Sequence, residues 1–157
     1  MRVYTNQVLD HLTLVREGHS TVVKASESPV LHVVGAWSAR VPGQDTLALA
    51  YPLDIRTRDG GLALTLHLPL EDYVAAVLAG ESAGFRSEQS LAAMAVAART
   101  YAVRFQGRHK AEGYDFCDTT HCQDLHISAV SERLRRSPDG VSAPAGCSVE
   151  GVDMRLS

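Results

Sequence analysis

Apolar and polar positions alternate with a period of two between residues 47 and 68. Two leucine-rich runs, LALAYPLDI (47–55) and LALTLHL (62–68), flank the sequence RTRDGG (56–61). An Asp-Gly-Gly sequence between two alternating runs is a strong signal for a tight turn. The pattern therefore predicts an antiparallel β-hairpin that carries its leucines on one face.

Further strands are predicted on the N-terminal side of this hairpin. The runs LTLVREGHSTVVK (12–24) and SPVLHVVG (28–35) combine valines and leucines with turn residues, which is typical of short strands. Within the hairpin, Pro52 indicates an edge position or a bulge, because proline cannot donate to a sheet ladder. His67 faces away from the leucines and is expected to be solvated. Trp37 is expected to pack under a loop, with sugar binding as the alternative.

The apolar pattern then changes to a helical period. The sequence LPLEDYVAAVLAGE (68–81) predicts a helix that begins near Pro69 and ends directly before Glu81. A second helix is predicted for SEQSLAAMAVAARTYAVRFQ (87–106), with Ser87 as its N-cap. Alanine is frequent in the second helix, and it favours helix formation and close packing. We therefore expect this helix to be buried on most of its circumference.

These elements predict an α+β fold in which antiparallel β-hairpins pack on two helices and a Cys/His loop follows. The chain divides into a β-rich segment (1–45), a core (46–130) and a tail (131–157). In the tail, proline, glycine and serine are frequent and apolar residues are scattered singly. Such a composition buries too little apolar surface to order a chain, so we expect the tail to be disordered beyond Arg136.

Composition narrows the classes of function. The net charge is −3 and the pI about 6.1, which does not support nucleic-acid binding, because nucleic-acid-binding domains carry a basic surface. No run of apolar residues is long enough to predict a membrane span. The N-terminal residues lack the apolar core of a signal peptide. The chain has 3 cysteines, so at least one cannot be paired in a disulfide within the chain.

Two cysteines and a histidine stand close together in FCDTTHCQ (116–123), within a region predicted to be a loop (107–128, the Cys/His loop). Zinc favours thiolate and imidazole ligands in a tetrahedron. The residues that could supply such a site are His109, Cys117, His121 and Cys122. Two alternatives remain open from the residues alone: a Cys117–Cys122 disulfide, or free thiols beside unrelated histidines.

Three further residues of the loop belong to this interpretation. His126 is a spare candidate ligand. Asp115 and Asp118 are candidates for outer-shell partners that hold an imidazole N–H. The spacing of the cysteines and histidines is not that of a zinc finger, so the residue types carry the prediction.

Glu81 is a candidate acid. It follows the apolar sequence AAVLAG and precedes SAGF, and an apolar setting disfavours a charged carboxylate and raises its pKa. A glutamic acid held in this way stays protonated near neutral pH and can donate its proton to a leaving group. The alternative is a solvated glutamate at the end of a helix.

Three blocks of the sequence resemble the SpoIID/LytB domain, a family that includes stage II sporulation protein D and the amidase enhancer LytB. They are YVAAVLAGE (73–81), SEQSLAAMAVAARTYAV (87–103) and YDFCDTTHCQ (114–123), and they occur in the order found in the family. The resemblance covers roughly residues 45–127. An AARTYA helix followed by a C-D-T-T-H-C-Q loop is highly specific for this family.

The resemblance implies a lytic transglycosylase. Stage II sporulation protein D cleaves the β-1,4 bond between N-acetylmuramic acid and N-acetylglucosamine in peptidoglycan glycan strands without stem peptides, leaving 1,6-anhydro ends. The family's catalytic glutamate corresponds to Glu81, and the Met-Pro that usually follows it is Ser82-Ala83 here. Some members carry zinc in the Cys/His loop. This implies a structural zinc ion on His109, Cys117, His121 and Cys122.

Other residues of the matching blocks are candidates for substrate binding. Arg99 could bind a sugar substituent or anchor its helix to a carboxylate, and Gln123 could position substrate or hold the loop. Tyr101 is a third candidate, with a place in the core as its alternative. Two other functions stay open: a glycan-binding module that enhances a cell-wall amidase, and a hydrolase with a catalytic zinc ion.

The resemblance also implies a location and a length. Peptidoglycan lies outside the cytoplasm, so an extracytoplasmic place in the cell envelope is expected. In the family, the domain continues past the Cys/His loop with further strands and a glycine-rich segment. The tail SPDGVSAPAGCSVEGVDMRLS (137–157) does not match that pattern, and we expect the C-terminal part of the family domain to be missing.

Overall fold

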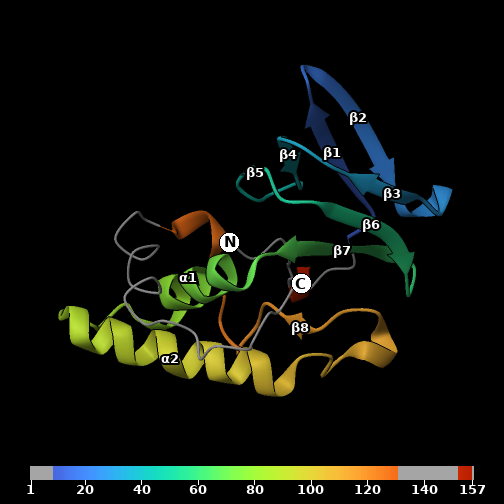
Figure 1. Cartoon of the computed structure of the whole chain (residues 1–157). Coiled ribbons are helices and arrows are strands. Elements are labelled where there is room, and N and C mark those ends of the chain that lie inside the picture. The colour runs from blue at the N-terminus through green and yellow to red at the C-terminus, as the bar shows by residue number, and fades with distance from the viewer. Residues whose placement is uncertain (1–8, 131–151, 157) are drawn as a thin grey trace. The chain divides into compact units, whose positions relative to one another are not determined.

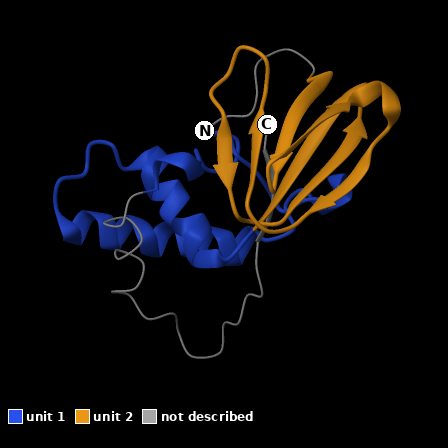
Figure 2. Cartoon of the chain, turned by 90° about the horizontal axis from the view of Figure 1, so that it is seen from above, with its two compact units in different colours: residues 1, 68–154 blue, residues 2–67, 155–157 orange. Residues whose placement is uncertain are grey.

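The computed structural model describes residues 9–130 and 152–156. These residues fall into two compact units, shown in orange and blue in Figure 2. The sheet unit comprises the described residues up to His67 with 155–156, and the helical unit comprises those from Leu68 to Met154. The predicted disordered tail lies outside the described residues, apart from strand β9 (Val152–Leu156).

The first sheet of the sheet unit consists of four antiparallel strands in the order β2-β1-β4-β5. Its strands are β1 (His11–Arg16), β2 (His19–Lys24), β4 (Trp37–Arg40) and β5 (Leu47–Leu49). Glu17 and Gly18 connect β1 to β2, and both have a positive φ, as the tight turn of a hairpin requires. The two strands predicted within 12–24 are therefore confirmed.

A second set of strands contains the predicted hairpin. β3 (Val30–Val33), β6 (Leu53–Arg58) and β7 (Gly61–Leu68) are neighbours in that order and antiparallel. Arg58 pairs with Gly61, so Asp59 and Gly60 form a two-residue turn with φ of +52° and +79°. The alternating leucines of β7 are buried, as the period-two pattern predicts.

Two details, at Pro52 and His67, differ from the predictions, and the structure adds a hydrogen bond to the prediction for Trp37. Pro52 does more than interrupt a strand: it separates β5 and β6, which pair in different sheets, and its carbonyl accepts a hydrogen bond from the His67 N–H. Trp37 is 3% exposed and lies within β4, where its Nε1 donates to the Tyr51 carbonyl at 2.7 Å. His67 is not simply solvated, because its ring bonds to Asp54.

The helical unit is built on α1 (Leu70–Glu81) and α2 (Glu88–Phe105), which pack against each other (Figure 1). Both predicted helices are confirmed, but Glu81 is the last residue of α1 rather than the residue after it. Every residue from Tyr73 to Leu78 is buried, so α1 is covered on all sides, as expected of a helix that is apolar all round.

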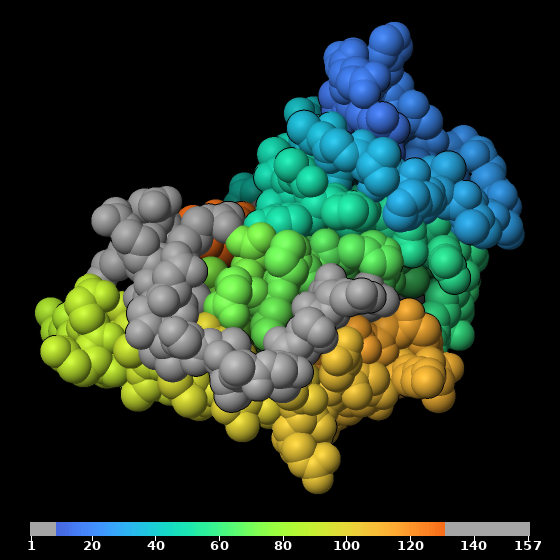
Figure 3. Space-filling model, viewed as in Figure 1, coloured from blue at the N-terminus to red at the C-terminus, as the bar shows by residue number. Residues whose placement is uncertain are grey.

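Helix α2 begins at the predicted cap, since Ser87 Oγ accepts a hydrogen bond from the Ser90 N–H at 3.1 Å. The prediction that α2 is buried on most of its circumference is wrong. Its buried positions follow one stripe: Leu91, Ala95, Ala98, Arg99 and Ala102. Val96, Val103 and Phe105 are exposed, and atoms of α2 form part of the surface shown in Figure 3. Alanine allows a close approach on one side of a helix but does not require neighbours on all sides.

The rest of the helical unit follows α2. A 3₁₀ turn, η2 (Lys110–Glu112), precedes the two-residue strand β8 (Phe116–Cys117), and a second turn, η3 (Ile127–Ala129), ends the Cys/His loop. A further 3₁₀ turn, η1 (Ala25–Glu27), lies in the sheet unit. The described residues contain two α-helices and antiparallel sheets, so the predicted α+β class is confirmed.

Candidate active site and metal centre

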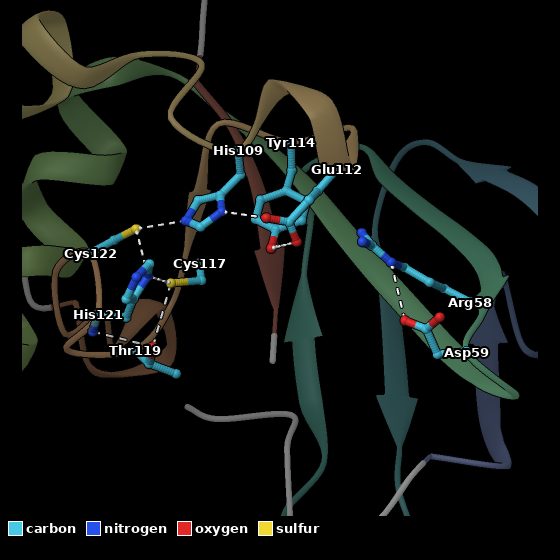
Figure 4. A network of polar contacts seen from close by, with 9 residues as sticks. All are labelled: Arg58, Asp59, His109, Glu112, Tyr114, Cys117, Thr119, His121 and Cys122. Carbon is cyan, nitrogen blue, oxygen red and sulfur yellow. Dashed lines mark hydrogen bonds and ion pairs between the residues drawn. The ribbon is translucent and has the colours of Figure 1, made fainter.

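The Cys/His loop brings four side chains together, and we call this group the loop cluster. It consists of His109, Cys117, His121 and Cys122, whose candidate ligand atoms all lie within 4.8 Å of one another. His109 ends the turn after α2, and Cys117 ends β8. His121 and Cys122 lie four and five residues after Cys117. Figure 4 shows the Cys122 sulfur linked to the rings of both histidines.

The spacing of these atoms fits a tetrahedral zinc ion. His109 Nε2 lies 3.3 Å from Cys122 Sγ, and His121 Nδ1 lies 3.6 Å from Cys117 Sγ and 3.9 Å from Cys122 Sγ. Zinc bonds to nitrogen and sulfur are about 2.0–2.3 Å long, so neighbouring ligands of a tetrahedron lie about 3.3–3.8 Å apart. Both cysteines are free, so the disulfide alternative is not the arrangement found here.

The protonation state of the thiols depends on whether a cation is bound. Burial raises the pKa of the Cys122 thiol, and the nearby Cys117 sulfur adds to this, so the thiolate is disfavoured in the isolated protein. A bound divalent cation reverses this balance, because a coordinating thiol is deprotonated. The residues of the loop cluster therefore fit a zinc ion by type, number and spacing.

An outer-shell partner orients His109, but it is not one of those predicted. The Nδ1 atom of His109 lies 2.9 Å from Glu112 Oε1, and the Tyr114 hydroxyl donates to Glu112 Oε2 at 2.8 Å. The Tyr114 ring also stacks on the His109 ring, with 4.8 Å between centroids. A carboxylate on the far nitrogen fixes the tautomer and direction of a ligating imidazole. For His109, Glu112 has the role that was predicted for Asp115 and Asp118.

The end of the Cys/His loop lies against the C-terminal half of α1. The His126 N–H donates to the Ala76 carbonyl at 3.0 Å, while the His126 ring lies near Asp124, so His126 is not part of the loop cluster. A Cβ atom on Gly80 would collide with the Asp124 carbonyl oxygen and lie 2.7 Å from the carbonyl carbon. Glycine is therefore required for the loop to pass this close to α1.

Gln123 also holds the Cys/His loop against α1, through a buried hydrogen bond. The hydroxyl of Tyr73, on α1, donates to Gln123 Oε1 at 2.7 Å, and both residues are buried. Burial raises the pKa of Tyr73 well above its ordinary range, so the hydroxyl keeps its proton and remains a donor. Of the two roles considered for Gln123, this hydrogen bond serves to hold the loop.

Glu81 lies where α1 meets this loop. Its Oε1 accepts a hydrogen bond from the Asp124 N–H at 2.9 Å, and the residue is exposed. The apolar setting predicted for the carboxylate is therefore wrong, because Glu81 occupies the open end of α1 and not its buried stripe. One carboxylate oxygen is oriented by the loop, and the group is accessible from solvent.

Arg99 and Tyr101 occupy different environments on α2. Arg99 is 7% exposed and forms a two-pronged ion pair with Glu71 in the first turn of α1, with N–O distances of 2.9 and 2.5 Å. This geometry matches the anchoring role considered for it. Tyr101 is half-buried, packs against Phe116 and accepts a hydrogen bond from Arg108 at 2.8 Å.

Glu81 and Gln123 therefore lie at the contact between α1 and the Cys/His loop, whereas Arg99 pairs with the first turn of α1. A sequence profile described as "Stage II sporulation protein" (SpoIID) matches residues 58–143, more than half of the chain. The chain belongs to the SpoIID family. No curated protein and no solved structure matches the chain significantly.

Membership of the SpoIID family supports a role related to the cell wall. The family match includes α1, α2 and the whole loop cluster, so the site described above lies inside the SpoIID region. Among the described residues, no helix is long and apolar enough to cross a membrane.

The roles of three residues of this SpoIID site were missed in the sequence. Gly80 had a readable signal, because a glycine inside a helix is unfavourable by about 1 kcal/mol relative to alanine and usually has a packing reason. Glu112 had a weaker signal: it lies three residues after His109 in a 3₁₀ turn, where positions i and i+3 align. Tyr114 had no signal beyond its nearness to the cysteines.

Proposed function

We propose that this SpoIID protein is a lytic transglycosylase that acts on peptidoglycan glycan strands, with Glu81 as its acid and base. One observation carries the proposal: the hydrogen bond from the Asp124 N–H to Glu81 Oε1, which orients an exposed carboxylate where α1 meets the Cys/His loop. An acid that reaches a long polymer must be both accessible and oriented, and Glu81 meets both conditions. Action on peptidoglycan places the protein in the cell envelope.

The proposed reaction needs a single carboxyl group. Protonated Glu81 gives its proton to the glycosidic oxygen between N-acetylmuramic acid and N-acetylglucosamine, and the C1–O bond breaks. The resulting carboxylate takes the proton of the muramic acid 6-hydroxyl, whose oxygen bonds to C1 and closes a 1,6-anhydro ring. Water does not take part, and Glu81 is protonated again at the end. This differs from glycosidases that use two carboxylates.

In this proposal the loop cluster holds a structural zinc ion. Four protein ligands leave no open position for water or substrate, which argues against a catalytic zinc ion. The ion would supply charge and fixed geometry to the loop, and the loop in turn holds Asp124 against Glu81. Arg99 and Gln123 are given supporting roles through Glu71 and Tyr73, and half-buried Tyr101 remains the proposed substrate contact.

A second function is favoured by a specific observation. The Glu81 carboxylate already accepts a backbone hydrogen bond, so its role could be to secure the loop of a glycan-binding module that enhances a cell-wall amidase. In that case, Glu81 would matter for structure and not for proton transfer. The two functions make opposite predictions for a glutamine at this position, because glutamine keeps the acceptor oxygen and loses the acid.

The experiment compares wild type, Glu81→Gln and Glu81→Ala on glycan strands stripped of stem peptides, with products analysed by mass spectrometry. If Glu81 is the acid and base, wild type releases 1,6-anhydro-muramic ends, and both variants lose activity by about 10²–10⁴-fold. Circular dichroism and urea denaturation check the fold of each sample. Glu81→Gln is expected to keep the wild-type stability because the hydrogen bond to Asp124 survives.

Two results would overturn the proposal. Cleavage that persists in Glu81→Gln would show that another group transfers the proton. Folded wild-type protein that binds the strands without cleaving them, and that raises the rate of an added cell-wall amidase, would establish the binding module. In that second case, Glu81→Ala but not Glu81→Gln should weaken the stimulation.

A further inference from the structure

A second group of chemically active side chains lies in the sheet unit, and we call it the sheet cluster. It consists of His32 on β3, Asp54 on β6 and His67 on β7. His32 pairs directly with Asp54, and Asp54 pairs with Thr65, two residues from His67. Side chains two apart on a strand share a face, so all three lie in a row across neighbouring strands.

The three side chains are in contact. His32 Nδ1 lies 2.6 Å from Asp54 Oδ1, and His67 Nε2 lies 3.2 Å from Asp54 Oδ2. One ligand atom from each residue can be chosen so that all lie within 4.8 Å of one another. The side chain of Asp54 is 19% exposed, while those of His67 and His32 are 34% and 62% exposed, so solvent reaches the cluster.

We infer that the sheet cluster binds a divalent transition-metal ion through two imidazoles and a carboxylate, at a site separate from the loop cluster. This ligand set suits ions such as Ni²⁺, Cu²⁺ and Zn²⁺, which favour imidazole nitrogen. Metal binding at the sheet cluster does not depend on the transglycosylase activity, and it uses other residues. Three protein ligands leave coordination positions open to water or to a donor atom of another molecule.

Two properties suit the sheet cluster to metal binding. The three residues sit on strands whose register is set by backbone pairing, so the protein orders little on binding an ion. Partial burial opposes ionisation of Asp54, but the hydrogen bonds and charges of His32 and His67 outweigh it and lower the pKa of Asp54. The carboxylate is therefore available as an anionic ligand.

One neighbour acts against the ion. The Arg56 guanidinium lies 3.8 Å from Asp54 Oδ2, and its positive charge repels a cation at the same carboxylate. Its side chain is 66% exposed, so solvent screens much of this repulsion. Removal of the charge should tighten metal binding by a few-fold, whereas it would weaken the carboxylate pairing of a metal-free ion network. Arg56→Gln therefore separates the two descriptions.

The experiment uses the full chain, loaded with one equivalent of Zn²⁺, and titrates it with Ni²⁺. Imidazole signals are followed by NMR, since a paramagnetic ion broadens the rings that it touches. The variants are His32→Asn and His67→Asn, with His19→Asn as a matched control because His19 is an exposed histidine on β2 of the same unit. Calorimetry gives the stoichiometry and affinity for each protein.

The expected result is one saturable equivalent of Ni²⁺ that broadens His32 and His67 and leaves His109 and His121 sharp. His32→Asn and His67→Asn should each weaken binding by more than about tenfold, which is the effect that loss of an outer-shell partner alone can reach. His19→Asn should bind as wild type does, and Arg56→Gln should bind more tightly. No saturable binding, or binding that is equal in all the histidine variants, would overturn the inference.

Discussion

The two histidine-containing clusters of this protein are built on opposite kinds of scaffold. The sheet cluster stands on three strands whose backbones pair with one another, and one of its histidine side chains is 62% exposed. The loop cluster stands on a chain segment with one two-residue strand and short 3₁₀ turns, and Cys117 is 9% exposed. The first scaffold is held by a continuous sheet ladder, and the second by separate turn hydrogen bonds and by side chains.

This difference indicates what each site requires from an ion. Backbone pairing and buried leucines already hold the strands of the sheet cluster in place. In the loop, side-chain hydrogen bonds add to those of the turns: the Glu112 carboxylate on His109, the Tyr73 hydroxyl on Gln123 and the Glu81 carboxylate on the Asp124 N–H. We therefore expect the loop to depend on its metal ion for stability, and the sheet to be nearly indifferent to one.

Removal of metal from the loop cluster should have the largest effect. At a free zinc concentration a thousand times the dissociation constant, a bound ion stabilises the folded protein by about 4 kcal/mol. Chelation, or Cys122→Ser, should therefore lower the free energy of unfolding of the helical unit by an amount of this order. Hydrogen exchange measured by mass spectrometry should show lost protection in residues 107–126.

The same exchange data contain the control for this prediction. Amides of β6 and β7 should keep their protection after chelation, because the backbone ladder holds them without an ion. Equal loss in β6, β7 and the loop would show that the two scaffolds do not differ in this way. Unchanged protection in the loop would show that the four ligands contribute no metal-dependent stability.

The next largest effect on stability is expected from a substitution where the loop closely approaches α1. Gly80→Ala places a methyl group against the backbone of Asp124, which cannot move without breaking the hydrogen bond to Glu81. Overpacking of this kind costs about 1–3 kcal/mol, partly offset by the higher helix propensity of alanine. Urea denaturation measures the change, and the digestion of glycan strands should fall with it.

Gly84→Ala is the matched control for Gly80→Ala. A Cβ atom on Gly84 would meet no atom within 4 Å, so this variant should be neutral or stabilising by less than about 1 kcal/mol. If Gly80→Ala is as stable as wild type and as active, the loop has room to shift. The approach to α1 would then not be what positions Glu81.

The difference between the two scaffolds also explains how much of each cluster could be predicted from the sequence. The ligands of the loop cluster are thiols and imidazoles concentrated in one short segment, so their types and nearness predict the site. The sheet cluster joins residues 22 and 13 positions apart, and they meet only because of strand register. The turn at Asp59–Gly60 and the cap at Ser87 were readable because each depends on adjacent residues.

The errors have physical causes of the same kind. Alanine content indicated a closely packed α2 but not on how many sides, so exposed Val96 and Val103 were not foreseen. The apolar run before Glu81 suggested a buried carboxylate, although the end of a helix leaves its last side chain open to solvent. In both cases the prediction rested on composition, whereas the direction in which each side chain points decides whether it is buried.

Loss of the ion pair between α1 and α2 should have a moderate effect on stability. Arg99→Met removes two hydrogen bonds to Glu71 and leaves that carboxylate without its buried partner. Because the Glu71 side chain is 46% exposed and can be solvated, we expect a loss of about 1–2 kcal/mol in the free energy of unfolding. Arg104→Met, on the exposed side of α2, should change it by less than about 0.5 kcal/mol.

Binding of glycan strands to Arg99→Met separates the two roles of this residue. If Arg99 anchors α2 to α1, the folded variant should bind glycan strands as the wild type does. A double-mutant cycle with Glu71→Gln should then show coupling between the two residues. A variant of wild-type stability with weakened glycan binding would instead make Arg99 a substrate ligand.

The smallest effect is expected for Asp54 in the metal-free sheet cluster. The pKa of Asp54 is lowered on folding, so its contribution is present above the pKa of the unfolded chain and is lost as pH falls through the lower folded value. Both partner histidines are exposed by a third or more, so we expect Asp54→Asn to cost less than about 1 kcal/mol at neutral pH. Urea denaturation of both proteins between neutral and strongly acidic pH measures the difference, which should shrink toward the acid end. If the difference in the free energy of unfolding is constant across this range, the Asp54 charge is not what joins the three strands. If it is as large as the loss caused by chelation at the loop cluster, the sheet depends on its polar cluster as the loop does.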